Sequence, residues 1–283
     1  MTKQDLITPA QNTWCPGCGN FTIQFALRNA IRDLVADGVP LENIVLVSGI
    51  GCHAKMADYL AINSFYSIHG RTIPVATGIK LANPDLSVIC CAGDGDAYAE
   101  GLDHLIFAAK RNSDITVIIH NNRVYGLTTG QYTPTSPLGY KGRSTPEGTP
   151  EEPFNPLSLM LASGAGFVAR STTRKMPHLA GTIARGLRHK GFAFIDVLQI
   201  CATYFNMSEL YDQQGYELSG HDPADFIAAC RKADEWNYNS DGPIAFGVFY
   251  EKERATFEGR FRKIAGPAGD RTGQIRALLE QKR

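Results

Sequence analysis

Residues 86–96 read LSVICCAGDGD, and residues 115–122 read ITVIIHNN. Each stretch is a short, nearly continuous run of apolar, largely β-branched residues that stops at glycines or at polar residues. Runs of this kind are typical of strands buried on both faces of a parallel sheet. The two stretches therefore predict two strands, Leu86–Ala92 and Ile115–His120, each followed at its carboxyl end by polar groups.

Strand-like and helix-like segments alternate on either side of this pair. Two further strands are expected at Ile44–Ser48 and Phe192–Gln199. Apolar residues with helical spacing predict helices over Phe21–Ala36, Ala97–Arg111 and Met176–His189. Strands that alternate with helices imply βαβ units. We therefore expect an α/β fold, an open and mostly parallel sheet with helices on both faces.

The rest of the chain predicts less regular structure. Thr128–Pro156 is rich in Pro, Gly, Ser and Thr, and a loop of this length is usually functional or disordered. After Cys201 the chain is a polar C-terminal extension with one further strand, Ile244–Tyr250. We expect a single domain over residues 1–283, with a core over 12–205 and the extension over 206–283.

Composition excludes little but gives a direction. Lys+Arg and Asp+Glu both number 28, so net charge gives no reason to expect nucleic acid or a membrane surface as a partner. No secretory signal opens the chain, and no run approaches the ~18 apolar residues of a membrane helix. These features predict a cytoplasmic protein. Seven cysteines, an odd number, favour metal ligation and buried thiols over a disulfide framework.

The GDGD and NN motifs predict a phosphate and metal site. Gly93-Asp94-Gly95-Asp96 and Asn121-Asn122 both follow strands, so both lie at the carboxyl edge of the sheet, where open α/β folds bind ligands. Glycine lets backbone amides approach a phosphate, and Asp94 and Asn122 offer the oxygen ligands that Mg²⁺ prefers. A GDG alone is common in turns. A calcium loop is disfavoured because Tyr98 occupies a ligand position, and the chain has no P-loop or GxGxxG fingerprint.

The spacing of GDG and NN resembles the diphosphate-binding motif of thiamine-diphosphate enzymes. This resemblance implies that Asp94, the side chain of Asn122 and the backbone carbonyl of Val124 bind magnesium. It also implies that Gly95 and Asp96 lie against the diphosphate and that Gly126 and Leu127 lie close to the cofactor.

The cysteines suggest a second site at the same edge. Cys15 and Cys18 form a CxxC, which is compatible with half a zinc site, a redox disulfide or half an iron–sulfur site. Cys52 and Cys201 each follow a predicted strand, so four thiols could converge beside the diphosphate site. The three remaining cysteines are expected to be buried thiols: Cys90, Cys91 and Cys230.

A more specific resemblance joins these motifs. WCPGCGN, GIGCH, His69-Gly70-Arg71, GDGDAYAEG and NNRVYGLTTGQ together resemble the β subunit of 2-oxoacid:ferredoxin oxidoreductases, over residues from about 12 to about 205. The resemblance implies one 4Fe–4S cluster held by Cys15, Cys18, Cys52 and Cys201. It implies a thiamine site lined by Ile50, Gly51, Cys52, His53 and His69.

Two positions near these motifs bear on catalysis. His69 and Lys55 are the residues expected to take part in it, with Lys55 helping to hold a substrate carboxylate or coenzyme A; the alternative for Lys55 is a solvated helix residue. Many family members read GLTKGQ, and here Thr129 replaces the lysine, so a role of that lysine is not carried over.

The family's activity is the oxidative decarboxylation of a 2-oxoacid with coenzyme A, with single electrons passing through the cluster to ferredoxin. The resemblance favours 2-oxoglutarate as substrate, with pyruvate next. Thiamine activation needs a glutamate on a second domain, for which this chain has little room, so we expect an α subunit to supply it in an αβ or (αβ)2 assembly. Two alternatives are a non-redox thiamine-diphosphate decarboxylase subunit and a non-enzymatic zinc or interaction module with a degenerate thiamine fold.

Overall fold

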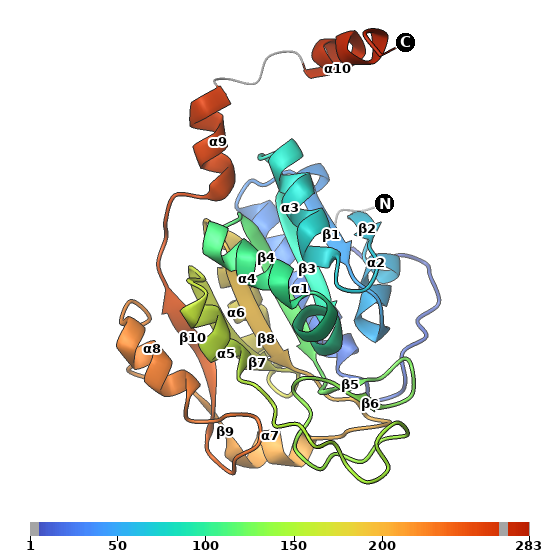
Figure 1. The fold of residues 1–283 in the computed structure, drawn as a ribbon, viewed down its shortest axis with the longest axis vertical. Coiled ribbons are helices and arrows are strands. Elements are labelled where there is room, and N and C mark those ends of the chain that lie inside the picture. Colours follow the sequence, from blue (N-terminus) through green and yellow to red (C-terminus); the bar gives the residue numbers. More distant parts are fainter. Residues whose placement is uncertain (1–5, 266–270, 283) are drawn as a thin grey trace.

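The computed structural model describes residues 6–265 and 271–282. Eight strands form one sheet in the order β2-β1-β3-β4-β8-β7-β10-β9 (Figure 1). The first six in this order are mutually parallel, and β10 runs antiparallel to β7. The strands are β1 (Ile44–Ser48), β2 (Asn63–Tyr66), β3 (Ser87–Gly93), β4 (Ile115–Asn121), β7 (Phe167–Thr172), β8 (Ala193–Leu198), β9 (Gly215–Glu217) and β10 (Ile244–Glu251).

Helices cover both faces of this sheet. One face is packed by α1 (Asn20–Ala36), α2 (Met56–Tyr59) and α6 (Met176–Arg188). The other is packed by α3 (Thr72–Ala82), α4 (Leu102–Arg111), α5 (Pro156–Ala162) and α8 (Phe226–Ala233). The remaining elements are a short hairpin, β5 (Val124–Tyr125) with β6 (Gln131–Tyr132), and the helices α7 (Ser208–Gln214), α9 (Phe257–Ala265) and α10 (Arg271–Glu280).

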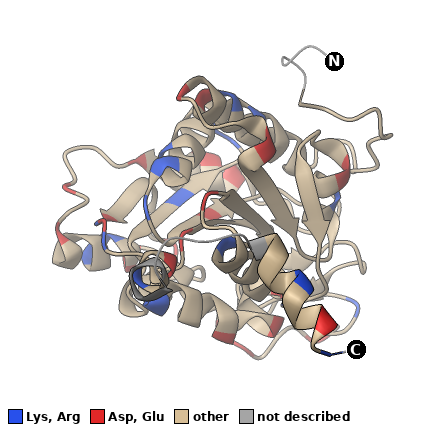
Figure 2. Cartoon of the chain, turned by 90° about the horizontal axis from the view of Figure 1, so that it is seen from above, with Lys and Arg blue, Asp and Glu red and all other residues tan. Residues whose placement is uncertain are grey.

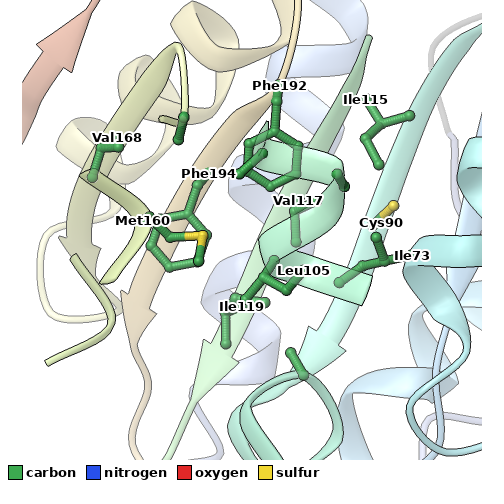
Figure 3. Packing of buried hydrophobic residues seen from close by; sticks show 14 of the residues in the cluster. Ile73, Cys90, Leu105, Ile115, Val117, Ile119, Met160, Val168, Phe192 and Phe194 are labelled. Carbon is green, nitrogen blue, oxygen red and sulfur yellow. The ribbon is translucent and has the colours of Figure 1, made fainter. Parts of the chain in front are cut away.

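Alternation along each central strand builds the two cores. On β8, Phe194 belongs to the core under α4 and α5, whereas Ile195 faces α1 and α6 on the other side. Figure 3 shows the first core, in which Phe194 lies among Val117 from β4 and Leu105 from α4. The sheet is therefore buried on both faces, as its near-continuous apolar strands require.

The expected α/β architecture is confirmed, and the four core strands lie within one or two residues of their predicted bounds. The predicted helix over residues 97–111 was wrong at its start. Asp96–Glu100 forms a π-helical turn, and α4 begins only after Gly101. A Cβ at Gly101 would lie 2.9 Å from the Asp96 carbonyl oxygen and 3.1 Å from Gly70, so the loop before α3 packs against this point. Regular helix gives way there to a close backbone contact.

The C-terminal extension is part of the same sheet. It contributes β10 and β9 at one edge, together with an aromatic cluster that includes Trp236 and Tyr238. Of the thiols expected to be buried, Cys90 and Cys91 are fully buried in β3. Cys230 was predicted wrongly, because its position on α8 leaves it partly exposed at the edge of the core.

Charges are mixed over the surface that Figure 2 shows, with lysine and arginine interspersed among aspartate and glutamate. Among the residues that the structure describes, no helix is both long enough and apolar enough to cross a membrane.

Candidate active site

The site lies where four adjacent strands end. β1, β3, β4 and β8 are neighbours and parallel, so the segments that follow them meet at one edge of the sheet. The chain passes from β1 outward to β2 and returns to β3 on the other side of β1, which makes the β1–β3 junction a topological switch point. Ligands of open α/β sheets bind in the crevice outside such a point.

A pocket opens at this junction, and twelve of the predicted site residues line it. They are Ile50, Gly51, Cys52, His53, His69, Asp94, Gly95, Asp96, Asn122, Val124, Gly126 and Leu127. The remaining predicted residues, Cys15, Cys18, Cys201 and Lys55, lie outside the lining. The structure thus gathers every residue predicted to touch the diphosphate or magnesium in one crevice.

Asp94 is a buried carboxylate at the floor of the pocket. Only 2% of its surface is exposed, and Thr135 Oγ1 donates a hydrogen bond to its Oδ2 at 3.1 Å. Burial raises the pKa of Asp94 to about 7, and in the described part of the chain no cationic side chain is among the groups that lower it. A buried carboxylate without a cation is costly. Asp94 therefore fits a metal ion at this point, as does the oxygen-rich environment.

Asn122 lies beside Asp94 in the same crevice. Its Oδ1 accepts the backbone N–H of Val124 at 3.1 Å, which folds residues 122–124 into a tight turn. This turn holds the Asn122 amide and the Val124 backbone together near the end of β4. The two groups are placed as one unit, so a ligand that meets one of them meets the other.

Asp96 is held in place from several sides. Its Oδ1 accepts the backbone N–H of Gly70 at 2.7 Å and lies 3.3 Å from His69 Nδ1. Burial opposes ionisation of Asp96, but hydrogen bonding to His53 and to the Gly70 amide and the charges of both histidines hold its pKa below the ordinary value. A Cβ at Gly49 would overlap the Asp96 carboxylate, so only glycine permits this approach.

His53 forms the wall between the ends of β1 and β3. Its Nε2 lies 3.1 Å from the backbone nitrogen of Gly93 and 3.5 Å from Asp96 Oδ2. A ring nitrogen accepts the first contact only without a proton and donates the second only with one. The shorter contact favours an unprotonated Nε2 that accepts the Gly93 N–H.

The four predicted cluster cysteines converge beside the pocket. A Cβ at Gly126 would lie 3.7 Å from both Cys52 Sγ and Cys201 Sγ. Burial raises the pKa of the Cys18 thiol to about 11, and the nearby thiols of Cys52, Cys201 and Cys15 contribute to the rise. Mutual repulsion of this kind keeps the thiols protonated unless a positive centre lies among them. The donor set and its position therefore fit an iron–sulfur cluster.

A compact single-ion site is a different arrangement. Within residues 6–265 and 271–282, no three His, Cys, Asp or Glu side chains form a group that could hold one metal ion. The fit to a cluster rests instead on the mutual proximity of the four sulfurs and on cysteine as the ligand type.

Lys55 does not reach the pocket. Its Nζ donates to Thr13 Oγ1 at 2.8 Å and so ties the CxxC segment to the turn that follows Cys52. The Trp14 indole N–H makes a second tie, to the Cys52 carbonyl oxygen at 2.6 Å. Burial raises the pKa of the Cys52 thiol, and the Lys55 ammonium opposes that rise. In this structure Lys55 lies beside the cysteines rather than in the substrate space.

Sequence analysis missed five residues of the pocket lining: Gly93, His120, Tyr125, Thr128 and Gln199. Three of these stand at the ends of β3, β4 and β8, so their positions at strand ends were a usable signal. His120 is buried, its Nδ1 lies 2.7 Å from Asn20 Oδ1, and its Nε2 has no protein partner among the described residues. Burial lowers its pKa well below the ordinary value, so the ring is neutral.

A buried polar network supports the pocket from behind. Asp196 accepts hydrogen bonds from Tyr98 at 2.8 Å, from Asn121 Nδ2 at 3.0 Å and from the Tyr238 hydroxyl. Arg170, fully buried, lies 4.0 Å from the same carboxylate and donates to Tyr238 at 3.3 Å. Tyr238 belongs to the extension, so the extension and the strand that carries Asn121 share one network.

Arg123 makes the second link between the extension and the pocket. This buried arginine has φ 64°, a left-handed conformation that costs energy in a residue with a side chain. Its Nε donates to the Thr135 carbonyl at 2.7 Å, and a further N–H donates to the Tyr238 carbonyl. The guanidinium also lies 5.5 Å from the Trp236 ring centroid. These contacts stabilise the turn that presents Asn122.

Comparison with known families agrees with this geometry. Residues 49–197 match the family described as thiamine pyrophosphate enzyme, C-terminal TPP binding domain, so the chain carries a thiamine-diphosphate-binding enzyme domain. Residues 201–266 match the family that describes the C-terminal part of the pyruvate ferredoxin oxidoreductase beta chain.

Individual relatives narrow the class. The chain is 42% identical over 88% of its length to a 2-oxoacid:ferredoxin oxidoreductase subunit beta from Saccharolobus solfataricus, covering 85% of that protein. It is 45% identical over 68% of its length to the 2-oxoglutarate synthase subunit KorB from Methanothermobacter thermautotrophicus, covering 66% of that protein. The chain belongs to the family of 2-oxoacid:ferredoxin oxidoreductase β subunits.

A solved structure shows the same fold. The 2-oxoglutarate:ferredoxin oxidoreductase from Magnetococcus marinus, with 2-oxoglutarate, coenzyme A and succinyl-CoA bound, matches with a TM-score of 0.88 and 32% identity. The match covers 98% of this chain and 97% of that one. The extension and the CxxC segment are therefore included in the likeness.

Proposed function

We propose that this chain, with an α subunit, catalyses the oxidation of 2-oxoglutarate by coenzyme A. The 2-oxoacid and coenzyme A give succinyl-CoA, carbon dioxide, one proton and two electrons, and the electrons leave singly through one 4Fe–4S cluster to two ferredoxins. The names and bound ligands of the relatives support 2-oxoglutarate, with pyruvate as the next candidate.

One observation carries the proposal: the sulfur site and the diphosphate site share a wall. A Cβ at Gly126 would lie 3.5 Å from Asn122 Nδ2 on one side and 3.7 Å from two cysteine sulfurs on the other. A single glycine therefore separates the proposed magnesium ligand from the proposed cluster ligands. Electrons released in the pocket have a short path to the cluster.

The residues of this chain have distinct roles in the reaction. Asp94, Asn122 and the Val124 carbonyl hold Mg²⁺ and so fix the diphosphate. Bound thiamine diphosphate supplies the electron sink that makes decarboxylation feasible. His53, held by the Gly93 amide, and Asp96, held by the Gly70 amide, shape the wall and exclude water from it.

The pocket is open on the side away from the sheet. Apolar side chains stand at this opening, with Ile68 70% exposed and Leu127 50% exposed. Large exposed apolar groups beside a site are typical of a surface that another chain covers. The α subunit would close the pocket here and bring the glutamate that activates the cofactor, in an αβ or (αβ)2 assembly.

The position of Thr129 bears on substrate binding. Many family members carry lysine there, and in this chain Arg143 Nη1 donates to Thr129 Oγ1 at 3.3 Å. The guanidinium thus brings a positive charge back to this loop from the segment that follows it. We propose that Arg143 meets the anionic part of 2-oxoglutarate or coenzyme A.

The test is anaerobic reconstitution of the αβ complex, followed by ferredoxin reduction across a panel of 2-oxoacids with coenzyme A. Cys52→Ala should abolish ferredoxin reduction and the broad absorbance near 400 nm, whereas Cys230→Ala, a thiol away from the site, should retain both. A colourless complex that contains zinc and no iron would contradict the proposal. Carbon dioxide release that Cys52→Ala leaves intact, without ferredoxin reduction in either protein, would favour the non-redox decarboxylase.

A further inference from the structure

Gln199 touches both halves of the site. It follows β8 directly, its side chain is buried, and it lines the pocket at the β4–β8 side. Its Nε2 lies 3.6 Å from Cys18 Sγ, within hydrogen-bonding distance for sulfur, with the side chain as donor. Among the described residues, it is the side chain that both lines the pocket and donates to a cluster cysteine.

The backbone fixes this side chain in place. The Gln199 N–H donates to the Asn121 carbonyl at 2.9 Å, and the Gly19 N–H donates to the Ile200 carbonyl at 3.0 Å. A Cβ at Gly19 would lie 2.8 Å from Gln199 Cγ, so a larger residue at 19 would displace the glutamine. Glycine in CPGCG thus makes room for Gln199 beside Cys18.

Cys18 Sγ receives a second donor from the opposite direction. It lies at the N-terminus of the 17-residue helix α1 and accepts the backbone N–H of Asn20. The helix N-terminus favours negative charge on the sulfur, and no acidic residue stands in the first turn to offset this. One sulfur of the set is therefore polarised by a helix amide and by a side-chain amide.

We propose that Gln199 tunes the reduction potential of the cluster through its N–H···S hydrogen bond to Cys18. This inference rests on the proposed function, because it needs the cluster. Reduction adds negative charge to the iron–sulfur unit, and a donor on a ligand sulfur stabilises that charge. The bond raises the midpoint potential, which helps the cluster to accept electrons released in the adjoining pocket. Gln199 acts on the cluster through its ligand and is not itself a catalytic residue.

The test is a redox titration of the anaerobic αβ complex, followed by electron paramagnetic resonance. Gln199→Met keeps the length of the side chain and removes the donor, so the midpoint potential should shift to a more negative value with iron content unchanged. Gln24→Met is the matched control. Gln24 is also buried and donates its amide, at 3.4 Å to the Tyr59 carbonyl, away from the sulfurs and the pocket. Its midpoint should equal that of the wild type.

A second measurement does not depend on a variant. Wild-type complex labelled with ¹⁵N in glutamine side chains should show a weak ¹⁵N coupling to the reduced cluster by pulsed resonance. An unchanged midpoint in an iron-replete Gln199→Met complex, equal shifts in both variants, or no ¹⁵N coupling in the wild type would each overturn the assignment. A complex without iron would instead overturn the proposed function, so the two failures are distinguishable.

Discussion

The extension stabilises the pocket through Tyr238, and removing one oxygen atom tests this. Tyr238→Phe deletes the hydroxyl that donates to Asp196 and accepts from Arg170 at 3.3 Å, while the ring stays against Trp236. A hydrogen bond to a charged group contributes about 1.5–3 kcal/mol, and two such bonds are lost at a fully buried site. We expect the free energy of unfolding to fall by about 3 kcal/mol. At roughly 2–4 °C per kcal/mol, the unfolding temperature should fall by about 6–12 °C.

The assay is scanning calorimetry of wild type and variants at one protein concentration, with thiamine diphosphate affinity measured alongside. Tyr250→Phe is the matched control. Tyr250 lies on β10 with its ring against Phe226, and its partly exposed hydroxyl makes no hydrogen bond within the described part of the chain. It should unfold within about 1 °C of the wild type, since a hydroxyl without such bonds contributes little. Equal unfolding temperatures for Tyr238→Phe and wild type would refute the role of this network.

Three further outcomes are expected. Arg143→Ala should raise the KM for 2-oxoacid or coenzyme A about tenfold, the loss of one charge-assisted contact, whereas Lys141→Ala in the same loop should not; steady-state kinetics that fail to separate the two would contradict this. Burial lowers the pKa of His189, so the unfolded chain binds more protons below pH ~6.5 and stability falls as the pH drops from there; His189→Gln should lessen this slope by up to about 1.4 kcal/mol per pH unit in urea titrations at stepped pH. Chelation of magnesium should weaken thiamine diphosphate binding, and Asp94→Asn should abolish the dependence on magnesium in calorimetric titrations.

The sequence predicted the site better than its supports. Ligands such as Asp94 and Cys52 follow apolar strands directly, and the ends of parallel strands meet at one edge, so chain order was enough to place them together. β7 was missed because its sequence FVARST carries a polar second half, including Arg170, which is buried only because Asp196 and Tyr238 meet it. That partnership joins residues far apart in sequence. No local pattern reports it.

The same limit applies to Lys55 and Gln199. Lys55 was assigned by position in a motif, yet its ammonium bonds to Thr13, 42 residues earlier. Gln199 stood next to a predicted ligand, yet its relation to Cys18, 181 residues earlier, depends on the absence of a side chain at Gly19. Both contacts form only when the CxxC segment packs against the sheet edge, which composition and periodicity do not specify.

The positions of the cysteines indicate how a thiamine domain becomes a redox subunit. The general thiamine-enzyme match covers residues 49–197, and Cys52 is the one proposed cluster ligand inside it. Cys15 and Cys18 precede that match, and Cys201 opens the segment that matches the oxidoreductase family. Three of the four sulfurs thus come from flanking segments that fold back on the common sheet edge. Removing residues 6–19 alone should therefore abolish the cluster, measured as bound iron, while thiamine diphosphate still binds in calorimetric titrations, since the hydrogen bonds that hold Asp94 and Asn122 come from Thr135 and Val124.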